Sequence, residues 1–327
     1  MAQTRPAPAV DVARRIEPRT VERLEKLARW DTTSVETIRS SYKAVRPAPV
    51  PADPGVERSD ATIAGSDGRP DVAARWYRPV GASEALPCLV YLHGGAYIMG
   101  TLEENDDRLD RMVLALGCAV CSVDWRLAPE HPYPAGLDDA ETVWRAIAAE
   151  PAAFGVDGER LVLMGNSAGG GLAAALCLRL RDRGARQPNL QVLIYPMLDD
   201  REATPSMRAL AAGGPGHWGL WHIEAQRLSW EAYLSGLAAG EVPDTAAPAR
   251  AADLAGVAPA FVGVGDVDAY LDEDVAYAAA LSRCGVPVEL HVYPGVIHGG
   301  FVPRPDTPRT EQFLRDAYAA IAFGFGR

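Results

Sequence analysis

The chain has 327 residues, of which 48% are hydrophobic and 23% charged, a composition typical of a folded globular protein with one or two domains. The formal net charge of −11 would repel a phosphate backbone, so we expect no binding of nucleic acid. There is no run of about 18 or more apolar residues, and residues 1–20 lack an apolar signal core. We therefore expect a cytoplasmic protein that neither enters a membrane nor is secreted.

The chain opens with a polar segment, residues 1–50, which shows one helical pattern at residues 21–29 and ends in prolines. We expect this segment to form an N-terminal arm or partial lid, followed by a linker. Residues 61–79 alternate apolar and polar side chains around a glycine turn, which predicts an antiparallel hairpin.

Beyond the hairpin, short apolar segments alternate with helical patterns. The apolar segments cover residues 88–92, 118–124, 161–165, 190–196, 260–266 and 288–294. The helical patterns cover residues 107–116, 137–149, 172–183, 274–284 and 311–321. Continuous apolar strands that alternate with helices predict an α/β fold, in which helices cover both faces of a mainly parallel sheet.

Five cysteines are scattered along the chain, and an odd, dispersed set of this kind suits a reducing compartment. Cys118 and Cys121 have the spacing of a redox or metal-binding pair. Both lie in an expected strand, however, where residues three apart point to opposite faces of the sheet. We therefore expect both to be core residues, and we predict no metal site.

The alternation stops between residues 200 and 260, where no strand pattern occurs. A connection of this length is unusual without structure of its own, so we expect a helical insertion over the carboxyl ends of the strands. Four large side chains of the insertion either line a ligand pocket or pack its own small core: Trp218, Trp221, His222 and Trp230.

One serine stands between a predicted strand and a predicted helix, in the stretch Gly165-Asn166-Ser167-Ala168-Gly169. In a G-x-S-x-G pattern the serine occupies a sharp turn that exposes its hydroxyl at the edge of the sheet. The flanking glycines remove Cβ atoms that would collide in so tight a turn. The helix that follows directs unpaired N–H groups at the site, so the pattern predicts a nucleophilic serine.

A serine hydroxyl needs a base to take its proton, and in this arrangement an acid and then a histidine follow the serine along the chain. Of the histidines after Ser167, His217 and His222 lie in the insertion and His291 lies inside a strand. His298 lies in the glycine-rich loop just past that strand, where the base is expected. We therefore predict that His298 is the base.

The acid is expected in the loop after residues 260–265, where Asp266, Asp268 and Asp272 compete. Spacing alone does not choose among them. Asp272 stands where a helix begins and is expected to cap that helix. Glu273 is expected to stay at the same helix start, where an acid is favoured by the helix dipole.

Acyl transfer also needs N–H donors for the negative charge that develops on the substrate oxygen. The stretch His93-Gly94-Gly95-Ala96 follows an early strand, and its backbone N–H groups lie where such donors are expected. We predict an oxyanion hole formed by Gly94, Gly95 and Ala96 together with Ala168 after the serine. His93 is expected to shape this loop through side-chain hydrogen bonds.

These motifs resemble those of the hormone-sensitive lipase-like (bacterial family IV) carboxylesterases of the α/β-hydrolase superfamily. The resemblance covers residues 89–301 and rests on five stretches in order: HGGAY, DWRLAPEHPYPAGLDD, GNSAGG, DAYLDED and YPGVIHGGF. It implies a serine carboxylesterase that cleaves short- to medium-chain acyl esters through an acyl-enzyme intermediate, with Ser167, Asp268 and His298 as the catalytic triad. It further implies a small-molecule ester as substrate and no cofactor, and it leaves a homodimer open.

The resemblance also implies a domain plan. Residues 51–327 would form an α/β-hydrolase domain with a mostly parallel central sheet and helices on both faces. Residues 1–50 and an insertion at about residues 200–245 would build a helical cap over the site.

Three departures from the family pattern stand out: Ala96 replaces a glycine, Asn166 replaces an acid, and residues 269–271 replace Pro-Leu-Arg. Ala96 keeps its N–H group, so the oxyanion hole is still expected.

Two alternative functions use the same residue types. One is a non-catalytic small-molecule receptor on the same fold. The other is a deacetylase or lactonase that acts on a specific metabolite, because the same machinery cleaves such bonds.

Overall fold

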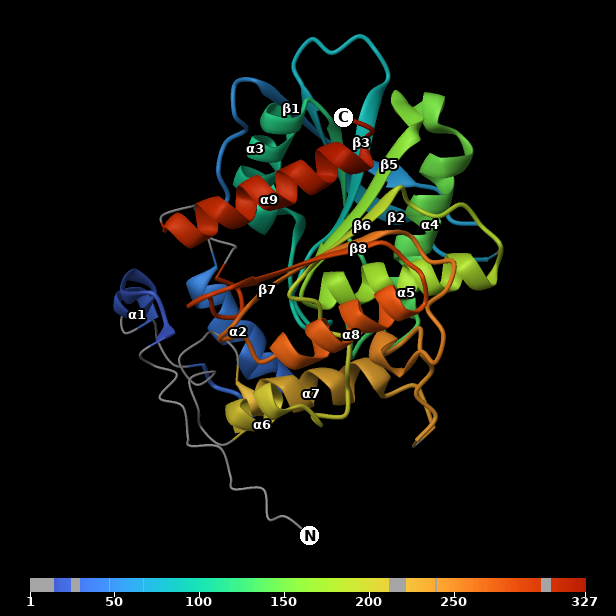
Figure 1. The fold of residues 1–327 in the computed structure, drawn as a ribbon. Coiled ribbons are helices and arrows are strands. Elements are labelled where there is room, and N and C mark those ends of the chain that lie inside the picture. The colour runs from blue at the N-terminus through green and yellow to red at the C-terminus, as the bar shows by residue number, and fades with distance from the viewer. Residues whose placement is uncertain are drawn as a thin grey trace.

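The computed structural model describes residues 15–24, 30–46, 48–66, 68–211, 222–238, 240–300 and 307–327 (Figure 1). Its centre is an eight-stranded sheet with the strand order β1-β2-β4-β3-β5-β6-β7-β8. The strands are β1 Val56–Ile63, β2 Val72–Pro79, β3 Leu86–Leu92, β4 Ala119–Val123, β5 Val156–Asn166, β6 Leu190–Ile194, β7 Ala260–Gly265 and β8 Val288–Tyr293. All six predicted apolar segments are therefore strands.

The sheet is mostly parallel, as predicted. Strands β1 and β2 form the expected antiparallel hairpin, and β2 pairs antiparallel with β4. Every pairing from β4 to β8 across the sheet is parallel. Parallel strands end at the same edge, so the loops after β3, β5, β7 and β8 are brought together there.

Helices cover both faces of the sheet, as the alternation of strands and helices predicts (Figure 1). The helices are α1 Pro18–Leu24, α2 Val35–Val45, α3 Asp106–Leu116, α4 Ala135–Ala149, α5 Ala168–Asp182, α6 Pro205–Ala211, α7 Ile223–Leu234, α8 Leu271–Arg283 and α9 Pro308–Gly324. Helices α4, α5 and α8 pack on one face, and α3 and α9 pack on the other. No helix in the described ranges is long and apolar enough to cross a membrane.

Side chains of the central strands alternate between two hydrophobic cores, one on each face of the sheet. Along β3, Val90 belongs to the core under α4 and α5, whereas Leu89 and Tyr91 belong to the core under α3 and α9. The same alternation separates Cys118 from Cys121, which lie in different cores, and both are free thiols. The expectation that this pair is structural is confirmed.

Helix α5 begins at Ala168, before the start at residue 172 that its sequence pattern predicts, and three consecutive glycines fall inside its first turn. Glycine has a poor helix propensity, which moved the predicted start to residue 172. A Cβ at Gly170 would lie 2.9 Å from Cβ of Pro196, and one at Gly171 would lie 2.3 Å from the Met197 carbonyl oxygen. The glycines are therefore required by close packing against the chain after β6.

The N-terminal arm contains a helix that the sequence analysis missed. The predicted pattern at residues 21–29 corresponds to α1, with residues 25–29 outside the described ranges. Helix α2 is additional, and it begins at a reciprocal capping box between Ser34 and Thr37. Val35, Ile38, Tyr42 and Val45 recur at helical spacing along it and pack on the core, so the sequence carried a helical pattern here that was overlooked.

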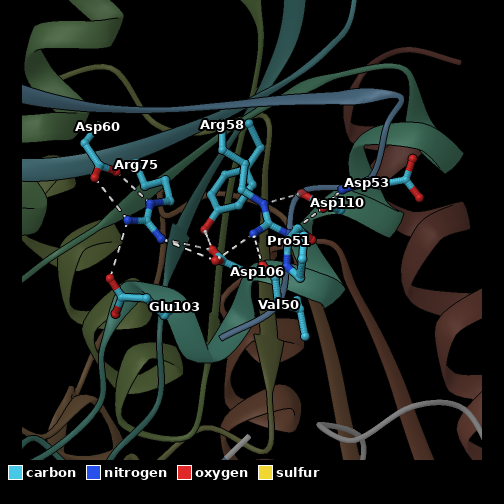
Figure 2. A network of polar contacts seen from close by, with 10 residues as sticks. Val50, Pro51, Asp53, Arg58, Asp60, Arg75, Glu103, Asp106 and Asp110 are labelled. Atoms are coloured by element: carbon cyan, nitrogen blue, oxygen red, sulfur yellow. Dashed lines mark hydrogen bonds and ion pairs between the residues drawn. The ribbon is translucent and has the colours of Figure 1, made fainter. Parts of the chain in front are cut away.

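A network of charged side chains fastens the β1–β2 hairpin to the N-terminal half of α3 (Figure 2). Arg58 of β1 donates to Asp106 at 2.8 Å and to both oxygens of Asp110 at 2.6 and 2.9 Å. Arg75 of β2 bridges Asp60 and Asp106. The side chains of Asp106 and Asp110 are both 4% exposed, so removal of one partner would leave a poorly solvated charge.

Candidate active site

Ser167 occupies the turn between β5 and α5 that its sequence motif predicts. Its backbone has φ 54° and ψ −122°, a conformation that is rare for a residue with a side chain. A Cβ at Gly165 would lie 2.0 Å from the carbonyl oxygen of Gly169, and one at Gly169 would lie 2.1 Å from that of Leu92. Both flanking glycines are therefore needed to form the turn, as predicted.

Ser167, His298 and Asp268 form a continuous hydrogen-bonded chain at the carboxyl edge of the sheet. The Oγ of Ser167 lies 3.0 Å from Nε2 of His298. The Nδ1 of the same ring lies 2.9 Å from Oδ2 and 3.2 Å from Oδ1 of Asp268. Because a carboxylate only accepts, Nδ1 carries the proton and Nε2 is left to accept one from the serine hydroxyl.

The imidazole of His298 is held between two aromatic rings that the sequence analysis did not single out. The ring of Tyr195 meets it edge to face at 4.7 Å and 68°, and that of Tyr270 at 4.8 Å and 88°. The backbone N–H of Tyr270 also donates to Oδ1 of Asp268 at 3.0 Å. These contacts fix the ring plane. Tyr270 lies inside the stretch DAYLDED, two residues after Asp268, and Tyr195 directly follows β6 at the carboxyl edge of the sheet; these positions are the signal that could have identified them.

The other acids of the loop after β7 have different partners. Asp266 accepts the Gly295 N–H at 2.7 Å and pairs with Arg15 of the arm. Asp272 was expected to cap its own helix, and this is wrong. Its carboxylate accepts the Ser206 N–H at 2.7 Å, in the first turn of α6. The competition among the three aspartates is thus decided by side-chain direction, with Asp268 alone facing His298.

Glu273 lies in the first turn of α8, as expected, but its carboxylate also serves a neighbouring segment. The side chain is buried and accepts the backbone N–H groups of Leu198 and Asp199 at 2.9 and 3.3 Å. Burial raises the pKa of Glu273 well above its usual value, an effect that these hydrogen bonds partly oppose. The neighbouring Asp274 is fully buried, and its carboxylate has no hydrogen-bond partner among the described residues.

His222 and His291 are the other histidines after Ser167 that the structure describes. His291 lies on the edge strand β8 and contacts Glu289 at 2.6 Å and Asp316 at 3.4 Å. His222 occupies the residue that precedes α7. His217 lies outside the described residues.

The loop of residues 93–100 follows β3 and lies beside the serine turn. We call it the oxyanion loop after the role that the sequence predicts for it. It is tightly folded: Gly95 has φ 128°, Ala96 φ 54° and Tyr97 φ 63°. A Cβ at Gly95 would lie 1.9 Å from the Met99 carbonyl oxygen, so only glycine fits there. Within the described part of the chain, the N–H groups of Gly94, Gly95, Ala96 and Ala168 donate to no backbone carbonyl.

His93 and its neighbours support this loop, as expected. Nδ1 of His93 lies 2.7 Å from the Gly94 carbonyl oxygen, and the ring stacks on Trp125 at 4.7 Å. Burial lowers the pKa of His93, which favours the neutral ring. Arg126 forms a bidentate pair with Asp139 at 2.8 to 3.0 Å, which holds the chain after β4.

Asn166, next to Ser167 in the chain, contributes to a second polar cluster. Its Oδ1 accepts the Tyr91 hydroxyl, and Arg108 donates to the same atom at 3.4 Å. A Cβ at Gly94 would lie 2.6 Å from Nδ2 of Asn166, so the amide also packs on the oxyanion loop. Tyr91 and Arg108 carried no motif and were missed.

The insertion after β6 is helical, as predicted, and includes α6 and α7. Trp230 of α7 is buried and lies 5.3 Å from the ring of Tyr97, while Tyr233 stacks on Tyr97 at 3.9 Å and 10°. Trp230 thus packs the insertion onto the oxyanion loop. Trp218 and Trp221 lie outside the described residues.

No cluster of three or more His, Cys, Asp or Glu residues in the described ranges is placed to hold a metal ion.

Comparison with known proteins agrees with this geometry. A family profile described as alpha/beta hydrolase fold matches residues 89–302. An ethyl acetate hydrolase of Pseudomonas putida is 34% identical, over 81% of this chain and 87% of its own. Carboxylesterase NlhH of Mycobacterium tuberculosis is 35% identical, over 81% of this chain and 82% of its own. The structure of a bacterial heroin esterase superposes with a TM-score of 0.87 at 33% identity, and the match covers 95% of this chain and 98% of that one.

The fold, the motifs and these relatives lead to one assignment. The chain belongs to the α/β-hydrolase fold family, in its hormone-sensitive lipase-like branch, and is a carboxylic ester hydrolase.

Proposed function

We propose that Ser167, His298 and Asp268 are the catalytic triad of this esterase. Ser167 attacks the ester carbonyl while Nε2 of His298 takes its proton. Asp268 keeps the imidazole oriented and stabilises its cationic form. His298 then protonates the leaving alcohol and afterwards activates the water that releases the acid from the acyl-enzyme. The observation that carries this proposal is the pair of contacts made by the two ring nitrogens, at 3.0 Å to Ser167 and 2.9 Å to Asp268.

The same proposal assigns the oxyanion hole to the backbone N–H groups of Gly94, Gly95, Ala96 and Ala168. Their lack of backbone acceptors among the described residues supports this role, because free donors can bind the charge that develops in the transition state. Ala168 also opens helix α5, whose dipole favours a negative charge at that end.

We further propose that the substrates are small esters of short- to medium-chain acids. One relative is named an ethyl acetate hydrolase and another, from Streptomyces hygroscopicus, an acetyl-hydrolase.

In our proposal the cap is formed by residues 1–50 and about 200–245, and the packing of α7 on the oxyanion loop supports it. The five free cysteines fit a reducing compartment such as the cytoplasm. A homodimer stays a prediction, which sedimentation velocity would test.

The proposal is tested by a nucleophile variant with a matched control. Ser167→Ala is expected to lower kcat for p-nitrophenyl butyrate by about 10⁶-fold, as in other serine hydrolases that lose the nucleophile. Ser122→Ala removes another buried serine hydroxyl, in β4, and should leave kcat unchanged. A fluorophosphonate should label the wild type and the control only. Wild-type turnover or labelling in Ser167→Ala would refute the assignment.

A series of p-nitrophenyl esters tests the substrate class. We expect kcat/KM to be highest between acetate and about octanoate and to fall steeply toward palmitate. Palmitate cleavage as fast as butyrate cleavage would contradict the proposed preference and leave the triad unaffected.

A further inference from the structure

One side chain of the N-terminal arm reaches the oxyanion loop directly. Arg39 of helix α2 donates from Nε to the carbonyl oxygen of Ile98 at 2.6 Å. Its Nη2 donates to the carbonyl oxygen of Ala128 at 2.8 Å. Ala128 in turn donates its N–H to the carbonyl oxygen of Tyr97 at 2.9 Å. One guanidinium thus joins the arm, the oxyanion loop and the segment after β4.

The remaining donors of this guanidinium hold it in place. Nη1 and Nη2 of Arg39 donate to the two carboxylate oxygens of Glu130 at 2.6 and 2.7 Å, a bidentate pair. This hydrogen bonding lowers the pKa of Glu130 to about 2, so the pair persists throughout the usual pH range of an assay. A planar fork of five donors suits such a junction, and a lysine ammonium cannot reach the same acceptors together.

The oxyanion loop has a conformation that needs outside support. Three consecutive residues, Gly95, Ala96 and Tyr97, have positive φ, and two of them carry side chains. Inside the loop, the Gly95 carbonyl accepts the N–H groups of Ile98 and Met99 at 3.0 and 2.9 Å. Positive φ is unfavourable for residues with a Cβ and persists where the surroundings enforce it. The contact of Arg39 falls on Ile98, immediately after this strained stretch.

We infer that Arg39 is a positioning residue: through Ile98 it holds the oxyanion loop in the conformation that presents the N–H groups of Gly95 and Ala96. The geometry of the oxyanion hole therefore depends on the seating of α2 on the body of the enzyme. The inference rests on the proposed function of this loop. It assigns the arm a part in transition-state binding, in addition to its part as a cover over the site.

Two variants at Arg39 and one matched control test this inference. Arg39→Lys keeps the charge, and Arg39→Ala removes it along with all the donors. Arg46→Ala serves as the control, because Arg46 lies at the end of the same helix and contacts Glu104 at 3.4 Å instead of the oxyanion loop. Arg39→Ala should lower kcat by about 10- to 100-fold, the scale of a misplaced catalytic group, with KM changed far less. The kcat of Arg39→Lys should lie between that of Arg39→Ala and that of the wild type. The kcat of Arg46→Ala should match the wild type.

An inhibitor that mimics the oxyanion separates positioning from general destabilisation. A trifluoromethyl ketone adds Ser167 to its carbonyl and places the resulting oxygen in the oxyanion hole. Its Ki should rise in the Arg39 variants by the same factor as kcat/KM falls, and methylguanidinium should partly restore kcat of Arg39→Ala. Glu130→Gln leaves Arg39 its contacts with the carbonyl oxygens of Ile98 and Ala128. Its kcat should therefore fall by no more than about fivefold, as expected for the loss of an exposed ion pair.

Several outcomes would overturn the inference. One is a kcat of Arg39→Ala within twofold of the wild type, and another is an unchanged Ki of the inhibitor in the Arg39 variants. A third is a decrease of kcat in Arg46→Ala or in Glu130→Gln as large as that in Arg39→Ala. Should Arg39→Ala fail to fold, Arg39→Lys gives the same readouts. Failure of the proposed function is distinct, because it would show as turnover by Ser167→Ala, whatever the Arg39 variants do.

Discussion

Replacement of Asp268 by asparagine alters a single atom of a carboxylate whose two oxygens have different partners. Oδ1 accepts the Tyr270 N–H at 3.0 Å, and Oδ2 makes the shorter contact, 2.9 Å, with Nδ1 of His298. An asparagine that keeps an acceptor toward Tyr270 must present its NH₂ group where Oδ2 lies. Nδ1 then faces a donor, which favours the tautomer with the proton on Nε2. That nitrogen can no longer accept the proton of Ser167.

The expected magnitude follows from this tautomer and from the burial of the pair. The Asp268 side chain is fully buried and that of His298 is 14% exposed, so water cannot take the place of the carboxylate. In a serine protease, the equivalent change lowers kcat by about 10⁴-fold. That factor corresponds to about 5 kcal/mol of activation free energy. We expect a similar loss here with a nearly unchanged KM, and a melting temperature within a few degrees of the wild type because the side-chain shape is kept.

The assay compares three aspartate-to-asparagine variants at matched active-site concentrations, measured with p-nitrophenyl butyrate. Asp266→Asn should retain turnover within tenfold, because Asp266 faces Arg15 and the Gly295 N–H. Asp272→Asn weakens the bond to the first turn of α6 and should cost about 1 kcal/mol of stability, with turnover preserved. An inactive Asp266→Asn or Asp272→Asn beside an active Asp268→Asn would refute the reasoning.

Three further changes probe the turn, the charged network and the buried acid. Gly169→Ala would place a Cβ 2.1 Å from the Leu92 carbonyl oxygen, so we expect no active folded enzyme, and normal melting with normal turnover would contradict the close packing. Asp106→Ala should lower the urea-unfolding free energy by about 3 kcal/mol with kcat unchanged, and a loss below the error of the fit would argue against a buried network. Burial raises the pKa of Asp274 well above 3.8, so the folded state binds this proton more tightly than the unfolded state does. The resulting stabilisation is fully present below 3.8 and is lost as pH rises through the raised pKa. Asp274→Asn should therefore melt higher than the wild type at alkaline pH, and parallel melting curves against pH would refute this.

Much of the fold and part of the site could be predicted from the sequence, because they rest on local signals. Buried parallel strands need continuous apolar runs, and five of the six predicted segments are strands inside the sheet. The sixth is the edge strand β8, whose side chains are largely exposed. The serine turn needs glycine at two fixed positions, so Gly165 and Gly169 identify Ser167 without any tertiary information. His298 could be selected because the chain order of this fold places the base after the last strand.

Only the tertiary structure decided features that depend on the direction of a side chain or on packing between distant segments. Asp266, Asp268 and Asp272 share one short stretch, and their roles differ because a loop and a helix start point them to different neighbours. Arg39 lies 59 residues before Ile98 in the chain, and a contact across such a separation leaves no local pattern. It exists because the folded sheet brings the loop after β3 to the place where the arm is seated.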